Sequence, residues 1–211
     1  MKPYLFTLGA NLSFALGSMF FTHFSRKFSS IWVNAMKASV ASICFLIAVL
    51  VMGGFHEITI LNMGIFLFSG FIALGIGDLF LLNAFSILGP GRTMVLFGFQ
   101  PIIIGGISYF LFNQSIESEK LYGIIFFLLC LFTFSYETFR SKGHWEIKGL
   151  LYAFLGMFID AIGIIITRYA FDMNKNLNAF EGNFYRCIGA VIAYVLLSRF
   201  IKIDFTKNMK A

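Results

Sequence analysis

Residues 63–85 read MGIFLFSGFIALGIGDLFLLNAF and hold one ionisable side chain, that of Asp78. A helix needs about 20 mostly apolar residues to cross the hydrocarbon core of a bilayer. The run does not alternate apolar and polar residues with period two, so it does not have the pattern of a barrel strand. It therefore predicts a membrane-spanning helix, and the rest of the chain repeats this pattern.

The composition of the 211 residues extends the interpretation to the whole chain. Hydrophobic residues make up 59% and charged residues 12%, against about 25% charged residues in an average soluble domain. Too few polar side chains remain to cover a water-soluble globule, and the high hydrophobicity excludes a disordered chain. The net charge of +6 is typical of basic residues at membrane edges, so we expect a lipid bilayer around the protein and no nucleic-acid partner.

Seven segments are long and apolar enough to span a membrane, and charged or helix-breaking residues separate them. We expect an all-α integral membrane protein whose helices cover residues 3–22, 31–52, 63–85, 93–112, 121–139, 149–170 and 180–200. The linker 140–148 is the most charged one. It divides the chain into a first part, residues 1–139, and a second part, residues 149–211.

The two parts repeat each other weakly. Asn34-x-x-Lys37 in the second span corresponds to Asn183-x-x-Arg186 in the last span, with an amide and a cation one helical turn apart in both. Because the first part has an odd number of helices, a second copy would enter the bilayer in the opposite sense. The pattern predicts a five-helix repeat followed by the first two helices of an inverted second repeat, an arrangement typical of transporters.

The stretch AFSILGPGRTMVLFGFQP, from Ala84 to Pro101, resembles the fourth helix of the EamA-type branch of the drug/metabolite transporter superfamily. The segment Leu121-Tyr-Gly123 is similar to the start of the family's fifth helix. This resemblance implies a multi-pass protein of the cell (inner) membrane, with two five-helix halves. It also implies that the protein moves small organic metabolites or drugs by alternating access.

The resemblance places Lys37 and Arg186 where members carry an arginine in the second and seventh helices. Gln114 stands where members often carry a glutamate, and a full member continues for three more helices, so the chain resembles a C-terminally truncated one. If it stops at Ala211, two helices of the second half lack their neighbours. We therefore expect a homodimer or a complementing membrane chain.

Two other classes of function stay open beside a transporter. The chain could be a non-transporting fragment or a partner subunit of a membrane complex. A less favoured alternative is an integral membrane enzyme that acts on lipid-linked substrates. Such an enzyme would gather ionisable residues at one membrane face, and the short loops of this sequence show no such cluster.

Ionisable side chains inside hydrocarbon cost several kcal/mol and each needs an explanation. Lys37 and Asp78 lie at matching depths of about 9 and 10 Å from the same face, at 1.5 Å per residue, so they can form an ion pair. The alternative is that Lys37 extends to the interface and Asp78 pairs structurally. Asp160 lies eleven residues into its span, and Arg186 is the nearest cation in depth. Proton coupling through Asp78 or Asp160 is a hypothesis.

Polar and helix-breaking residues inside the spans complete the candidate pathway. The amides can bind a solute or hold helices together, and Pro101 should kink the fourth span and free a carbonyl group. No cysteine or histidine spacing indicates a metal site, and no nucleotide or hydrolase motif occurs, so we expect no catalytic residue and no cofactor. The residues predicted for the solute or ion pathway are Asn34, Lys37, Asp78, Gln100, Pro101, Asp160, Asn183 and Arg186.

Lysine and arginine residues are distributed unequally between the two faces. One face has only Lys2, Lys120 and Lys175. The positive-inside rule therefore puts the other face in the cytoplasm and the N-terminus outside, whereas the resembled family has a cytoplasmic N-terminus. The basic residues of this second face are Arg26, Lys27, Arg92, Arg140, Lys142, Lys148, Arg199, Lys202, Lys207 and Lys210.

Overall fold

A computed structural model describes residues 2–112, 122–126, 129, 132–133, 136 and 146–200. Within these residues, six helical stretches are long and apolar enough to cross a membrane, which confirms the all-α membrane fold. The expected span 121–139 and most of the linker 140–148 lie largely outside the described residues. The helices are α1 (Lys2–Lys27), α2 (Ser30–Val51), α3 (Ile60–Gly70), the π-helix η1 (Phe71–Gly77), α4 (Asp78–Leu88), α5 (Pro90–Phe97), α6 (Gln100–Phe112), α8 (Ile147–Met173) and α9 (Ala179–Phe200).

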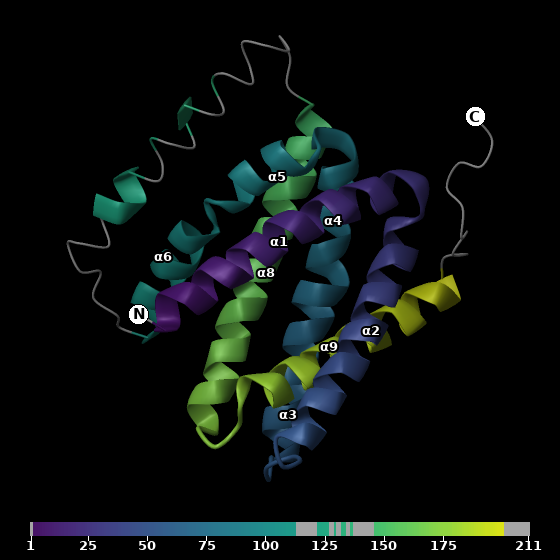
Figure 1. Cartoon of the computed structure of the whole chain (residues 1–211), viewed down its shortest axis with the longest axis vertical. Helices are drawn as coiled ribbons and strands as arrows, with labels where there is room; N and C mark the ends of the chain where they lie inside the picture. The colour runs from purple at the N-terminus through teal and green to yellow at the C-terminus, as the bar shows by residue number, and fades with distance from the viewer. Residues whose placement is uncertain are drawn as a thin grey trace.

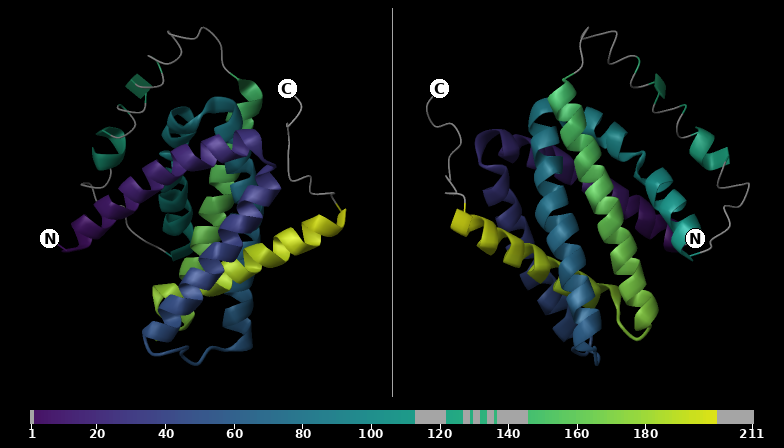
Figure 2. Two further views of the ribbon diagram at one scale, coloured as in Figure 1. Left: turned by 45° about the vertical axis from the view of Figure 1, so that its right-hand side comes forward. Right: turned by 180° about the vertical axis from the view of Figure 1, so that it is seen from behind.

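The helices α3, η1 and α4 follow one another as a continuous rod through the bundle (Figure 1). Helix α8 packs along all three parts of this rod, and α9 packs on α3, η1 and α2. Helix α1 runs obliquely across one side of the bundle, where it contacts α4 (Figure 2). The rod is thus the element on which both later helices of the described chain, α8 and α9, pack.

The expected fourth span is broken in two. Helix α5 ends at Phe97, a turn at Gly98 and Phe99 follows, and α6 begins at Gln100. Pro101 has no backbone N–H, so it cannot donate a hydrogen bond to the carbonyl of Phe97 four residues before it. The kink predicted from Pro101 is confirmed as a full break, and it places Gln100 at the first position of a new helix.

The π-helix η1 was not expected from the sequence. In a π-helix each hydrogen bond reaches back five residues, so the turn is wider than in an α-helix and such turns are frequent at functional sites. The hydroxyl of Tyr194 on α9 donates to the carbonyl oxygens of Leu74 (2.7 Å) and Gly75 (2.8 Å) in this segment. The wide turn rotates α4 relative to α3, and Asp78 is the first residue of α4.

Glycine residues allow the rod and its neighbours to approach at backbone distance. A Cβ atom at Gly70 would lie 1.8 Å from the carbonyl oxygen of Arg186, and one at Gly189 would lie 2.0 Å from that of Leu67. The two glycines therefore hold α3 and α9 in contact. Close packing of small residues is the usual means of helix association in membranes, because the hydrophobic effect does not drive helices together in lipid.

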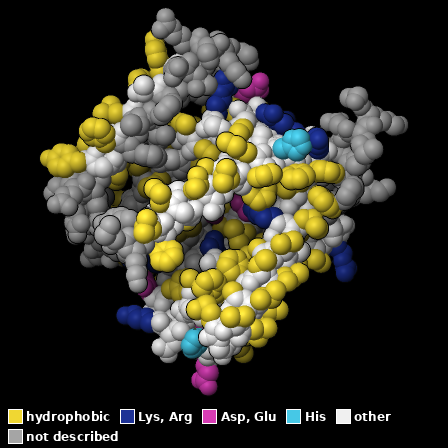
Figure 3. Space-filling view, in the orientation of Figure 1, with side chains coloured by type: hydrophobic (Ala, Val, Ile, Leu, Met, Phe, Trp, Pro, Cys, Tyr) yellow, Lys and Arg dark blue, Asp and Glu magenta, His cyan; other side chains and the backbone are white. Residues whose placement is uncertain are grey.

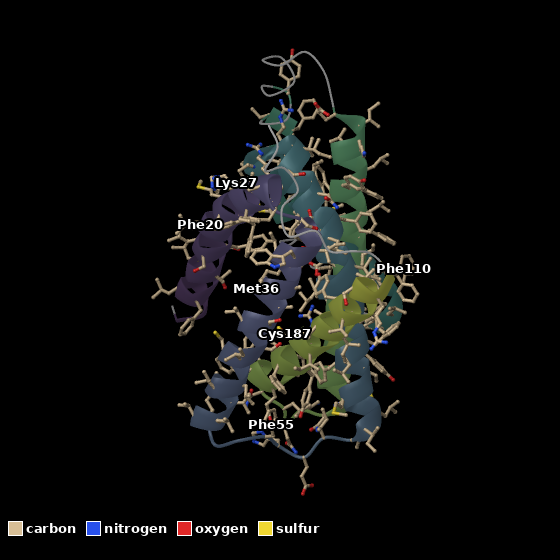
Figure 4. All side chains as sticks on the ribbon, turned by 90° about the vertical axis from the view of Figure 1, so that its right-hand side faces the viewer. Phe20, Lys27, Met36, Phe55, Phe110 and Cys187 are labelled. Carbon is tan, nitrogen blue, oxygen red and sulfur yellow. The ribbon has the colours of Figure 1, made fainter. Side chains whose placement is uncertain are left out.

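The outer surface of the bundle is apolar, as a lipid-facing surface must be. Phe20 on α1 and Phe110 on α6 point away from the bundle on opposite sides (Figure 4), and they are 66% and 84% exposed. Large hydrophobic side chains with such exposure recur along α1, α2 and α6. An aqueous protein would not leave so much apolar surface uncovered.

The two ends of the bundle carry different groups. At one end, Arg26 Nε donates to the carbonyl oxygen of Ser86 (3.4 Å), and α8 begins against the end of α4 close to Lys148. At the other end, Asn174 Nδ2 donates to the carbonyl oxygen of Glu57 (3.0 Å), which joins the α8–α9 loop to the α2–α3 loop. Lys148 and Arg26 therefore share an end, and Lys175 lies at the opposite one.

Replacing Gly70 by alanine is expected to destabilise the fold, because the added methyl group collides with the backbone of α9. The loss should be about 1–3 kcal/mol, the range of overpacked cores. Gly64→Ala on the same helix is the matched control, since nothing lies within 4 Å of its added Cβ. Thermal unfolding of the purified variants in detergent measures the difference, and equal midpoints for the two variants would contradict the packing described here.

Positive charge at the Arg26 end predicts that this end faces the cytoplasm. In intact cells, a membrane-impermeant thiol reagent should then label Lys175→Cys and miss Lys27→Cys, in a background without the native cysteines. After the cells are permeabilised, both variants should react. Labelling of Lys27→Cys alone in intact cells would reverse the orientation.

Candidate functional site

An ion pair joins α2 to α4 inside the bundle. Lys37 Nζ donates a hydrogen bond to Asp78 Oδ2. The Asp78 side chain is 11% exposed and that of Lys37 is 29% exposed, so the cation is the more accessible partner. The pairing predicted from their matching depths is confirmed, and their role in a pathway stays a prediction.

Asp160 on α8 has a different partner from the one expected. Its carboxylate oxygen Oδ2 accepts a hydrogen bond from Gln100 Nε2 (2.7 Å). Arg186, the nearest cation in depth, forms no direct ion pair with Asp160, and its guanidinium donates from Nη1 to Asn183 Oδ1 (3.3 Å) on its own helix. Gln100 reaches Asp160 because the break before Pro101 starts α6 at this residue, and α6 packs on α8.

Four ionisable side chains from four helices nevertheless act on one another electrostatically. Asp160 interacts with Asp78, Lys37 and Arg186, and Arg186 interacts with both carboxylates. We call Lys37, Asp78, Asp160 and Arg186 the charged cluster. It contains two acidic and two basic groups, so its formal charges balance. Such groups in the interior of a membrane bundle are typical of solute and ion pathways.

The asparagines of the repeated Asn-x-x-Lys and Asn-x-x-Arg patterns have different surroundings in the structure. Asn34 is fully buried, and its side chain lies close to the hydroxyl group of Tyr194 on α9. Asn183 is half-buried and its Nδ2 donates to the carbonyl oxygen of Ala179 (2.9 Å) on the same helix.

Glu181, whose side chain is fully buried at the start of α9, was not predicted from the sequence. Its carboxylate accepts hydrogen bonds from the ring Nδ1 of His56 (3.0 Å) and from the backbone N–H of Asn178 (2.9 Å). Asn178 Oδ1 accepts in turn from the backbone N–H of Glu181 (3.0 Å). This reciprocal pair is a capping box, and the spacing Asn178-x-x-Glu181 was the signal that could have found it.

A groove of about 520 Å³ lies between α1 and α2. Figure 3 shows the surface hollowed below α1, with basic and acidic side chains visible inside the hollow. Met36, on the α2 wall, is labelled in Figure 4. The ammonium of Lys37 lies 5.5 Å from the centre of the Phe21 ring in the opposite wall. The residues that line the groove are Phe21, Phe24, Trp32, Val33, Met36, Lys37, Val40 and Ala41.

Comparison with known proteins connects this arrangement to one family. The sequence model of the EamA-like transporter family matches residues 1–136, which is more than half of the chain. Neither the comparison with curated proteins nor that with solved structures found a match. The match thus covers α1 to α6 and includes Lys37, Asp78 and Gln100, but it ends before Asp160 and Arg186.

Removing one member of the ion pair should cost more than removing both. Lys37→Met leaves the Asp78 carboxylate without its hydrogen-bonded cation, and the free energy of unfolding should fall by about 3–5 kcal/mol. Adding Asp78→Leu should recover most of this loss, because no buried charge is then left over. Unfolding in detergent measures both variants, with Lys175→Met as an exposed control. Simply additive losses in the double variant would contradict a coupled pair.

Proposed function

We propose that this chain, which belongs to the EamA-like transporter family, carries a small organic solute across the cell (inner) membrane by alternating access. Membership makes it a membrane transporter of small molecules. The observation that carries the finer proposal is the charged cluster, to which α2, α4, α8 and α9 each contribute one side chain. A solute that reaches the cluster meets both signs of charge inside the bundle.

The energetic cost of the charged cluster supports a role in transport. A buried ion pair can often be replaced by apolar residues of similar volume with no loss of stability. Retaining four ionisable groups at this depth therefore points to a function beyond holding the helices together. Two interrupted helices lie next to them, at η1 before Asp78 and at the turn before Gln100. Interrupted helices are common at the binding sites of transporters.

Asp160 is the better of the two candidates for a coupling proton. The Asp78 carboxylate is hydrogen-bonded to the Lys37 ammonium, whereas the Asp160 carboxylate is hydrogen-bonded to the neutral amide of Gln100. A protonated Asp160 can still accept that hydrogen bond, so it can gain or lose a proton without breaking the contact. A protonated Asp78 would leave the charge of Lys37 uncompensated.

The two parts of the chain meet at this site. Residues 1–139 are proposed as the first five-helix repeat and residues 149–211 as the start of an inverted second repeat, with 140–148 as the linker. The packing of α8 on α4 and of α9 on α2 supports this division, because it brings Asp160 and Arg186 of the second part next to Lys37 and Asp78 of the first. Rocking of one part against the other would expose the cluster to alternate sides.

Asp160→Asn should abolish proton-coupled flux, since an amide cannot take up the proton. Proteoliposomes with an internal pH dye report proton movement while a panel of radiolabelled organic solutes is tested for uptake. We expect solute-driven proton movement to fall at least about tenfold, or about 1.4 kcal/mol. Asp172→Asn on the same helix is the control, because its side chain is 57% exposed near the helix end. Unchanged pH dependence in Asp160→Asn would rule out coupling through this residue.

A further inference from the structure

The groove between α1 and α2 indicates which class of solute reaches the charged cluster. We propose that it binds a membrane-dissolved anionic amphiphile, with the anionic head on Lys37 and the apolar body along Phe21, Trp32 and Met36. This inference rests on the proposed transport function, for which it names the substrate class. The volume of about 520 Å³ lies in the range of small-molecule sites, which is about 300–1,000 Å³.

The walls of the groove suit a hydrocarbon or aromatic body. Every lining residue other than Lys37 is apolar, and three of them are aromatic. On the outer face of α2, Val40 and Ile43 are 54% and 59% exposed, and on α1 Phe20 is 66% exposed. These side chains contact lipid in a membrane, so the groove opens between lipid-facing surfaces. A solute that is already dissolved in the bilayer can enter it sideways.

Lys37 gives the groove a preference for negative charge. Among the described residues that line the groove it is the only charged one, and its side chain is more exposed than that of Asp78, which is not among them. An anion therefore meets the ammonium first, whereas an organic cation meets a like charge. An ammonium partly exposed to hydrocarbon is unfavourable, so an anionic head that covers it is stabilising.

The depth of Lys37 fits an amphiphile rather than a wholly apolar molecule. Lys37 lies seven residues after Ser30, where α2 begins, and at 1.5 Å per residue this is about 10 Å from the helix end. The long lysine side chain can reach part of this distance toward the interface. A head group can thus stay near the polar layer while the body occupies the aromatic part of the groove.

Binding of an anionic head changes the partner of Lys37, and the other residues of the charged cluster can compensate for this change. When an anionic head takes a share of the Lys37 ammonium, the Asp78 carboxylate loses part of its counter-charge. Arg186 already interacts electrostatically with Asp78, and its buried Nε has no hydrogen-bond partner within the described residues. Arg186 can therefore offset part of the Asp78 charge while Lys37 is shared between Asp78 and the head group.

Trp32 provides a direct probe, because the chain has only one other tryptophan, Trp145. The Trp145→Phe variant of the full chain, in nanodiscs of phosphatidylcholine, is titrated with a doxyl-labelled fatty acid at a pH where it is ionised. The doxyl-labelled alcohol and amine of equal length serve as neutral and cationic comparisons. We expect saturable quenching by the acid at a concentration at least tenfold lower than for the alcohol or the amine.

Variants test separately how the charge and the shape of the groove contribute to binding. Lys37→Gln should remove the preference for the acid, and Lys175→Gln should keep it. Ala41→Phe narrows the groove and leaves the ion pair in place, so it should weaken binding of the acid even if Lys37→Gln fails to fold. Equal quenching by acid and alcohol, stronger quenching by the amine, or full competition by sodium acetate would each overturn the proposal.

Flux measurements distinguish the failure of this inference from the failure of the proposed function. One outcome is that the acid does not bind but a water-soluble solute is transported in an Asp160-dependent way. The proposed substrate class is then wrong, and the proposed transport function is supported. Another outcome is that the acid binds with the expected preference but no solute of the panel is transported. The groove is then a lipid-binding site, and the proposed transport function is wrong. Doxyl-labelled acid that binds and also crosses proteoliposome membranes faster with the protein than without it supports both.

Discussion

Hydrocarbon cannot solvate a charge, and this constraint determines how the interior of the bundle is arranged. Lys37, Asp78, Asp160 and Arg186 come from four helices, and each has to find its counter-charge or hydrogen bond inside the protein. The Lys37–Asp78 ion pair joins α2 to α4, and the Gln100–Asp160 hydrogen bond joins α6 to α8. The glycine contacts of the rod hold it against α8 and α9, which carry Asp160 and Arg186.

Features that follow from regular helix geometry could be predicted from the sequence. The spans follow from the length of each apolar run, and the Lys37–Asp78 pair follows from a fixed rise per residue in two antiparallel helices. The break before Pro101 follows from the missing N–H of proline. Each of these depends on one segment or on two consecutive spans, so no knowledge of the three-dimensional packing is needed.

Features that depend on how distant helices pack could not be predicted in this way. Gln100 is separated from Asp160 by 60 residues, and depth alone favoured Arg186 because it says nothing about which face a side chain occupies. The π-helix is hidden because Phe71–Gly77 is apolar throughout and fits an α-helical span equally well. Glu181 differs, since its capping box is a local signal and only the attachment to His56 requires the tertiary structure.

The π-helix also makes the fold sensitive to changes in the number of residues in this segment. Substitutions within Phe71–Gly77 alter local packing, but they leave the number of residues between α3 and α4 unchanged. A π-turn holds about one residue more than an α-turn, so it already absorbs one extra residue. Insertion of a further codon there, with the helix otherwise unchanged, would turn α4 by about 100° about its axis. Asp78 would then leave the face that meets Lys37, although every residue of the charged cluster would still be present. In this segment the length of the chain is under stronger constraint than the identity of its side chains.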